Sequence, residues 1–231
     1  MVIEGLVRPR TVLLDVNESI FDLSTLAPFF TRAGLAPHAL EWWFAAVLRD
    51  GFALAATEGF AEFPDLAGAA FDEVAFAAGV TTRSGQVEEL IGLFAQLAPH
   101  PDVRAGLECL ADARIPAVAL TNSTSATASG LFERATMSSL VSRVISITDV
   151  GVWKPRAEPY LHAAKVLALA PSSLVLVAVH PWDLHGARRA GVRSAWVNRT
   201  GRAFPSYFSA PDVVAARYDD VMRALVALPD S

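Results

Sequence analysis

Four polar side chains at separated positions have the types needed for covalent hydrolysis: the carboxylates of Asp15 and Asp183, the hydroxyl of Thr121 and the amine of Lys154. A carboxylate can form a covalent ester with a substrate, which divides one difficult displacement into two easier steps. A nearby ammonium group would keep such a carboxylate ionised in a partly dry site and lower its pKa. Each residue alone has a simpler explanation, such as a helix cap, a turn residue or a solvated charge.

These four residues lie directly after predicted strands or in the loops that leave them. Short apolar runs typical of buried parallel strands occur at 12–14, 117–120, 144–147, 174–179 and 194–197. Helical patterns occur near 103–110, at 126–134, at 157–169 and before Gly191. Strands alternating with helices indicate right-handed βαβ units and a parallel α/β sheet. The loops after parallel strands open on one edge, so we expect the four side chains to converge there.

Residues 20–101 interrupt this alternation, because they contain no convincing strand. Helices are predicted after a cap at Ser24, after Pro37, after Pro64 and after a cap at Ser84, and the first of them ends at Gly34. The segment 98–101 then breaks the chain with two prolines. The sequence therefore predicts an α/β core domain from 1–19 and 102–231, with an all-helical cap domain inserted at 20–101.

Composition limits the classes of protein to which the chain can belong. It has 231 residues, 53% of them hydrophobic and 19% charged, so it can bury a sizeable core. The net charge of -5, without a block of like charges, argues against a nucleic-acid partner. The single cysteine, Cys109, excludes an intramolecular disulfide. Residues 1–10 lack a signal-peptide pattern and no apolar run is long enough to span a membrane, so we expect a soluble cytoplasmic protein.

The polar residues also fall into an ordered set of motifs. They are Asp15 with Ser19 four positions on, Thr121 with Asn122, Lys154-Pro155 with Tyr160 six positions after the lysine, Trp182-Asp183 followed by Gly186-Ala187, and Val197-Asn-Arg-Thr-Gly201. In this order and spacing the chain resembles the haloacid dehalogenase superfamily, and its 2-haloacid dehalogenase branch in particular. The resemblance covers nearly the whole chain and implies a Rossmann-like parallel core with an inserted helical cap.

The resemblance implies a role for each of these residues. Asp15 would be the nucleophile that forms an aspartyl ester, and Ser19 and Thr121 would hydrogen-bond its carboxylate. Asp183 would orient Lys154 and help to activate water for the second step. Halide is a good leaving group that needs only a polar or aromatic cradle, which Asn122 and Trp182 could supply. The substrate-binding set is completed by Ser19 itself and by four further residues: Asn17, Phe44, Tyr160 and His180.

Two positions separate this chain from the phosphatases of the superfamily. Those enzymes carry a second aspartate two residues after the nucleophile, where this chain has Asn17, which lacks the acidic proton of a carboxylic acid. They also carry an acidic magnesium ligand where this chain has Val179, and a hard cation requires oxygen ligands. We therefore expect metal-independent chemistry with no cofactor, and Mg²⁺ only if the chain is a small-metabolite phosphatase after all.

Three positions also depart from the dehalogenases themselves. Phe44 stands where they carry a cap arginine, and Arg49 and Arg32 are the candidates to replace it. Ala178 and His180 stand where the branch has serine and asparagine. His180 could be a base or a polar contact, and it is equally well explained as a partly buried histidine before a turn proline. The main hypothesis is a 2-haloacid dehalogenase-like hydrolase of a small molecule, and the resemblance alone implies a homodimer. The alternatives are a phosphatase and a non-catalytic ligand-binding relative.

Overall fold

The computed structural model describes residues 5–230, so positions 1–4 and 231, which fall at the two ends of the expected core domain, lie outside it. Within this range the strands form one sheet in the order β3-β2-β1-β4-β5-β6, with every neighbouring pair parallel. Their bounds are β1 (Thr11–Leu14), β2 (Ala117–Thr121), β3 (Arg143–Ser146), β4 (Leu174–Ala178), β5 (Arg193–Val197) and β6 (Val213–Ala215). The predicted parallel α/β sheet is confirmed.

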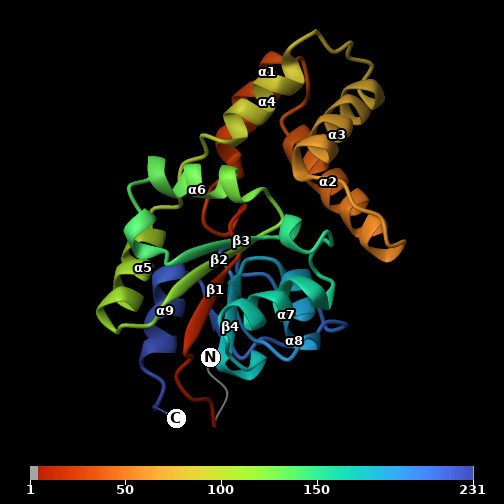
Figure 1. Cartoon of the computed structure of the whole chain (residues 1–231). Helices are drawn as coiled ribbons and strands as arrows, with labels where there is room; N and C mark the ends of the chain where they lie inside the picture. The colour runs from red at the N-terminus through yellow and green to blue at the C-terminus, as the bar shows by residue number, and fades with distance from the viewer. Residues whose placement is uncertain (1–4, 231) are drawn as a thin grey trace.

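Alternate residues of β1 face the two sides of the sheet, as the geometry of a strand requires. Leu13 packs with side chains from α7 (Ala157–Val166) and α8 (Pro181–Arg189) on one side. Val12 and Leu14 belong to a second cluster with α5 (Val103–Asp112), α6 (Ser125–Arg134) and α9 (Tyr218–Val226). Figure 1 shows α5 and α9 side by side on one face of the sheet and α7 and α8 on the other. Because helices cover both faces, β1 is fully buried and its carboxyl end is fixed in the middle of the sheet.

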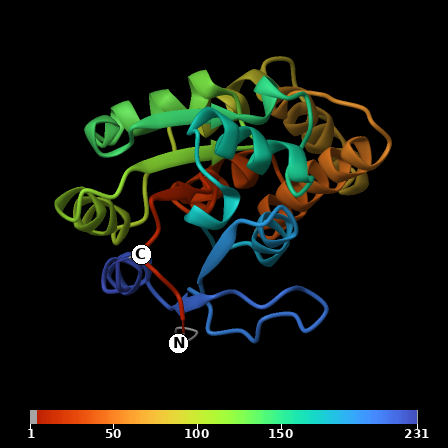
Figure 2. The ribbon, with the colours of Figure 1, turned by 60° about the horizontal axis from the view of Figure 1, so that its bottom comes forward.

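The segment after β1 forms the expected helices and returns to the core only at α5. It contains the short 3-10 helix η1 (Leu23–Leu26), α1 (Ala27–Arg32), α2 (Ala39–Ala56), α3 (Phe63–Ala77) and α4 (Gln86–Phe94). Figure 1 shows α1–α4 gathered above the sheet, and Figure 2 shows the same group to one side of it. The indole N–H of Trp43 donates to the Ala67 carbonyl (2.8 Å) and joins α2 to α3.

Trp153, from the loop after β3, connects these helices to the core of the sheet. Its indole N–H donates to the carbonyl of Ala61, at 2.9 Å, and its ring stacks on Phe63. Arg156 adds a hydrogen bond to the carbonyl of Ala55, also at 2.9 Å. These contacts hold α2 and α3 over the edge of the sheet at which the polar residues of the core emerge.

Several element ends differ from the sequence predictions. The side chain of Asp22, not Ser24, caps η1, and Gly85, in the left-handed region at φ 84°, precedes α4 instead of Ser84. Ile147 begins the 3-10 helix η3 (Ile147–Asp149) rather than ending β3. Two elements were not predicted from the sequence: β6, which is only three residues long, and α9, although Tyr218, Val221, Met222 and Leu225 repeat at helical spacing. No helix within residues 5–230 is long and apolar enough to cross a membrane.

Candidate active site

The strand ends bring the expected charged residues into direct contact. Asp15 follows β1, Asp183 lies in the first turn of α8 after β4, and Lys154 comes from the loop after η3. The Nζ atom of Lys154 lies 2.9 Å from Oδ1 of Asp15 and 2.7 Å from Oδ2 of Asp183. The three side chains are almost wholly buried, so solvent screens these ion pairs very little. The predicted convergence of these loops is therefore observed.

Asp15 is held by a second partner on its other oxygen. The hydroxyl of Ser19 donates to Oδ2 at 2.6 Å, and the same hydroxyl accepts the backbone N–H of Val179 at 3.0 Å. Burial alone would raise the pKa of Asp15, but the charge of Lys154, the neighbouring imidazole of His180 and the hydrogen bond from Ser19 outweigh it and lower that pKa. Asp15 is thus an ionised carboxylate of fixed orientation, and it caps no helix.

Lys154 is fully buried, which excludes its interpretation as a surface lysine. Its ammonium group donates to Asp15, to Asp183 and, at 3.0 Å, to the carbonyl oxygen of Leu120, which occupies all three of its hydrogens. Burial would lower the pKa of Lys154, but the two neighbouring carboxylates outweigh it and raise that pKa. The ammonium therefore stays charged and is fully committed to the protein.

Asp183 faces away from the open side of the site. One carboxylate oxygen accepts from Lys154 and the other accepts from the hydroxyl of Tyr160. Burial, with the charge of Asp15 added to it, raises the pKa of Asp183. The N-cap position of α8 belongs to His180, so Asp183 is not the cap of this helix. In this geometry Asp183 orients Lys154, and its fully buried carboxylate does not line the space over Asp15.

A small cavity lies over Asp15 and contains most of the residues expected to bind substrate. Its volume is about 10 Å³, and its lining consists of Asp15, Asn17, Phe44, Leu48, Phe63, Asn122, His180 and Trp182. The Nδ2 atom of Asn122 and the Oδ1 atom of Asn17 are buried there without a hydrogen-bond partner among the described residues. Because buried polar atoms are normally paired, these two are suited to a ligand. Asn122 is oriented through Oδ1, which accepts the backbone N–H of Lys154 at 3.0 Å.

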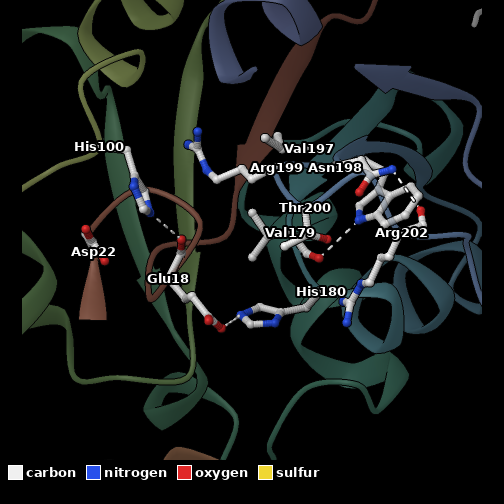
Figure 3. A pocket seen from close by; sticks show the side chains of 11 residues that line it. Glu18, Asp22, His100, Val179, His180, Val197, Asn198, Arg199, Thr200 and Arg202 are labelled. Carbon is white, nitrogen blue, oxygen red and sulfur yellow. Dashed lines mark hydrogen bonds and ion pairs between the residues drawn. The ribbon is translucent and has the colours of Figure 1, made fainter. Parts of the chain in front are cut away.

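His180 separates this cavity from two larger ones. Its ring also lines cavities of about 220 Å³ and about 310 Å³, and it stacks on Trp182 with the ring centroids 5.1 Å apart. Its Nε2 atom lies 3.7 Å from Oδ2 of Asp15 and 3.4 Å from Oε2 of Glu18. Figure 3 shows the ring of His180 directed toward the carboxylate of Glu18 in the cavity of about 220 Å³.

Two expected site residues lie elsewhere than predicted. Thr121 is fully buried and its hydroxyl accepts the backbone N–H of Ser123, and no hydrogen bond joins it to Asp15 among residues 5–230. Tyr160 is also fully buried and contacts Asp183 from behind, so it lines none of the cavities at Asp15. The expectation that Tyr160 binds substrate directly was therefore wrong, because its side chain belongs to the core between α7 and α8.

The two arginines considered as replacements for the missing cap arginine are exposed and do not line the space over Asp15. Arg49 pairs with Asp50 and Glu73 on the exposed side of α2, and Arg32 pairs with Glu89. Leu48 and Phe63 also line the space over Asp15 and were not predicted from the sequence. Leu48 lies one helical turn after Phe44 and so shares its face, which the helical period could have indicated. Phe63 arrives from a different helix, and no local pattern predicts its position.

Comparison with known proteins agrees with this arrangement. The sequence model of haloacid dehalogenase-like hydrolases matches residues 12–191. The (S)-2-haloacid dehalogenase 2 of Pseudomonas sp. (strain CBS-3) is 26% identical over 220 residues, which cover 94% of this chain and 95% of that protein. Haloacetate dehalogenase H-2 of Moraxella sp. (strain B) is 24% identical over 141 residues, which cover 61% of this chain and 63% of that protein.

Solved structures share the fold. The L-2-haloacid dehalogenase from Xanthobacter autotrophicus with chloropropionic acid covalently bound superposes with a TM-score of 0.89 at 20% identity, covering 95% of this chain and 99% of that one. The sequence match extends from β1 into the end of α8 and its following turn, and so includes Asp15, Lys154 and Asp183. This chain belongs to the haloacid dehalogenase-like hydrolase family.

Proposed function

We propose that this chain is a 2-haloacid dehalogenase-type hydrolase with Asp15 as its nucleophile. In the first step a carboxylate oxygen of Asp15 attacks the halogen-bearing carbon, a carbon–oxygen bond forms, and the halide leaves with the electrons of the carbon–halogen bond. In the second step water cleaves the aspartyl ester, which gives a hydroxy acid and restores Asp15. The names of the curated relatives support a small halogenated acid as the substrate class.

The observation that carries this proposal is the state of Asp15 at the base of the cavity. Its charge is maintained by Lys154, its orientation is fixed by Ser19, and one face is exposed to a space lined by apolar side chains and two amides. A carboxylate that is ionised yet poorly hydrated is a competent nucleophile for carbon. The buried, unpartnered N–H₂ group of Asn122 could donate to a departing halide, beside the aromatic ring of Trp182.

Metal-independence is part of the proposal. Asn17 and Val179 occupy positions at which the phosphatase pattern requires carboxylates, and the backbone N–H of Val179 serves to orient Ser19. Within residues 5–230 no group of three or more His, Cys, Asp or Glu side chains is arranged to hold a metal. Halide needs no general acid, so the loss of an aspartate at position 17 does not hinder this reaction.

Halide release tests the proposal directly. Purified protein is incubated with each enantiomer of 2-chloropropionate in metal-free buffer with a chelator, and chloride is followed over time. Asp15→Asn is the matched variant, because it keeps the side-chain size and removes the nucleophile. We expect chloride release by the parent protein only. Magnesium-dependent hydrolysis of p-nitrophenyl phosphate, without chloride release, would instead support the phosphatase alternative.

Single turnover in heavy-oxygen water tests the covalent step. Water attacks the carbonyl carbon of the ester, so the label enters the carboxylate of Asp15, while the product hydroxyl carries an unlabelled oxygen from the protein. Mass spectrometry of the peptide that contains Asp15 measures this uptake. Label that appears only in the product would show direct attack by water and would contradict a nucleophilic role for Asp15.

Three further properties remain sequence predictions. The cytoplasmic location is a prediction from the sequence, and a homodimer follows from the family resemblance. The division into a core of 1–19 and 102–231 and a cap of 20–101 is supported by the chain path, although one hydrophobic cluster runs through both parts. Analytical ultracentrifugation and limited proteolysis of the purified chain would test the last two.

A further inference from the structure

The proposed reaction needs a base for its second step, and the residue expected to help with it is blocked. Water that attacks the aspartyl ester must give up a proton as the new carbon–oxygen bond forms. Both carboxylate oxygens of Asp183 already accept hydrogen bonds, from Lys154 and Tyr160, and its side chain is fully buried. Lys154 is equally unsuited, because all three of its hydrogens are bound and its pKa is raised.

The lining of the cavity leaves one candidate. Of the residues around the space over Asp15, only Asp15 and His180 can titrate, and Asp15 is itself the esterified group in the intermediate. The Nε2 atom of His180 lies 3.7 Å from Oδ2 of Asp15, within the distance that one bound water molecule could bridge. The ring is positioned by stacking on Trp182 and lies 6.1 Å, between centroids, from the ring of Phe44.

Glu18 completes the arrangement from the outer side. Its backbone has a φ of 64°, in the left-handed region that residues other than glycine rarely adopt. This conformation is held by a hydrogen bond from its N–H to the carbonyl of Phe21 (2.9 Å), and its own carbonyl contacts Nε2 of His100 at 2.9 Å (Figure 3). As a result, its carboxylate lies 3.4 Å from Nε2 of His180. The carbonyl oxygen of Asn17 lies 3.3 Å from the same atom.

We propose that His180 is the general base for hydrolysis of the aspartyl ester, with Glu18 as its positioning residue. This inference rests on the proposed function. Nε2 takes a proton from water as the water oxygen bonds to the carbonyl carbon of Asp15. The ester bond then breaks, its electron pair stays on the substrate oxygen, and the imidazolium gives that oxygen its proton. Asp15 loses the remaining proton to solvent and is again a carboxylate. Glu18 and the carbonyl of Asn17 stabilise the imidazolium between these transfers.

The test compares the two steps in single-turnover experiments with (S)-2-chloropropionate. His180→Gln keeps a polar side chain of similar length without a base. His185→Gln is the matched control, because His185 lies in α8, the helix that follows His180, but contacts Ser209. Rapid quenching followed by chloride assay and intact-protein mass spectrometry measures alkylation and ester loss separately. We expect His180→Gln to release one equivalent of chloride, to accumulate the ester adduct and to lose steady-state rate by about 10²–10⁴-fold. His185→Gln should match the parent protein.

A second variant tells a chemical role from a structural one. His180→Ala leaves room for exogenous imidazole, which should speed loss of the adduct in this variant and leave the parent unaffected. Glu18→Gln should slow ester loss by about tenfold without changing the alkylation rate. Steady-state rates within threefold of the parent for His180→Gln, or slow chloride release with no adduct, would overturn the role of His180. If the parent protein itself releases no chloride and forms no adduct, the proposed function fails, and the role of His180 fails with it.

Discussion

The hydroxyl of Tyr160 donates a hydrogen bond to Oδ1 of Asp183, and both side chains are fully buried. Burial and the adjacent carboxylate raise the pKa of Tyr160 well above its usual value, so it remains a neutral donor at any ordinary pH. The bond fixes the rotation of the Asp183 carboxylate and directs the other oxygen at Lys154. Tyr160 therefore acts on Asp15 through two intermediate side chains, Asp183 and Lys154, and does not line the space over Asp15.

Replacing Tyr160 by phenylalanine should weaken both folding and catalysis. Asp183 would lose a partner on one buried oxygen, so we expect the free energy of unfolding to fall by about 1.5–3 kcal/mol. The freed carboxylate would hold Lys154 less firmly, and kcat should fall by about tenfold or more with little change in KM. The matched control is Tyr218→Phe, because the Tyr218 hydroxyl is equally buried but has no hydrogen-bond partner among the described residues. Urea denaturation should show the control unchanged or more stable.

Lys154→Met should be the most damaging substitution in the charged cluster. It would leave the carboxylates of Asp15 and Asp183 buried beside each other without a cation, and breaking a buried pair costs about 3–5 kcal/mol. The pKa of Asp15 should rise, because the charge that lowers it is gone. We expect chloride release to be abolished at neutral pH. The control for a general loss of charge is Arg188→Met, which removes a half-buried cation of α8 that pairs with Asp212. A comparable loss of activity in the Lys154 and Arg188 variants would argue against a specific role of Lys154.

The sequence predicted the charged centre better than its surroundings, for a physical reason. A parallel sheet places the ends of β1 and β4 and the loop after β3 at one edge, so Asp15, Lys154 and Asp183 could be brought together from their order alone. The order of the strands does not determine the direction in which a side chain points. Tyr160 turned toward the core instead of the cavity, because α7 packs against α8 and buries it there.

The side chains of α2 and α3 that line the space over Asp15 were harder to predict, since their positions depend on contacts between segments far apart in the sequence. Leu48 and Phe63 come from different helices and reach the cavity only because α2 and α3 pack together and rest on Trp153. β6 was missed because three residues carry too little periodicity, and its pairing with β5 is what defines it as a strand. Tertiary packing, not local propensity, decides such elements.

Gly51 should not tolerate even one added methyl group. A Cβ atom built there would lie 2.5 Å from the ring of Trp153, so α2 could no longer approach the core as closely. We expect Gly51→Ala to destabilise the protein by about 1–3 kcal/mol through overpacking, despite the better helix propensity of alanine. Gly130→Ala in α6 meets nothing within 4 Å and should stabilise by about 0.5–1 kcal/mol. The midpoints of urea denaturation should fall for Gly51→Ala and rise for Gly130→Ala.

Asp102 should make the free energy of unfolding depend on pH in the acidic range. Its Oδ2 accepts from Arg199 at 2.7 Å and from the backbone N–H of Tyr218 at 2.8 Å, which joins the start of α5 to the loop after β5 and to α9. Burial would raise the pKa of Asp102, but the bonds from Arg199 and Tyr218 outweigh it and lower that pKa below 3.8. A depressed folded-state pKa stabilises the fold above the unfolded value, and this contribution is lost as pH falls through the folded value.

Asp102→Asn should accordingly cost about 1–3 kcal/mol at pH 7. The difference from the parent protein should shrink as the pH falls below 3.8, where protonation removes the same charge from the parent. Urea titrations at pH 7, 5 and 3 measure this convergence. Asp112→Asn, at the exposed end of the same helix, should show no such trend. A cost for Asp102→Asn that is constant with pH would mean that the carboxylate charge is not the source of the stabilisation.

Phe44 should set the size of substrate that reaches Asp15. Its ring, with Leu48 and His180, lines both the 10 Å³ space over Asp15 and the neighbouring cavity of about 310 Å³, so these three side chains separate the two. Phe44→Ala should join the cavities and favour longer 2-halo acids. We expect kcat/KM for 2-chlorohexanoate relative to 2-chloropropionate to rise by about tenfold, a change that corresponds to one or two methylene contacts.

The control for Phe44 lies on the other side of α2. Trp42→Ala removes an exposed aromatic ring from the same helix, and Trp42 does not line the space over Asp15. It should leave the ratio between the two acids unchanged. Phe44→Ala should itself lower the free energy of unfolding by about 3–5 kcal/mol, so both variants are compared at a temperature well below their unfolding midpoints. If the ratio does not move when Phe44 is shortened, substrate reaches Asp15 by another path, and the larger cavity beside Phe44 and Leu48 is not its entrance.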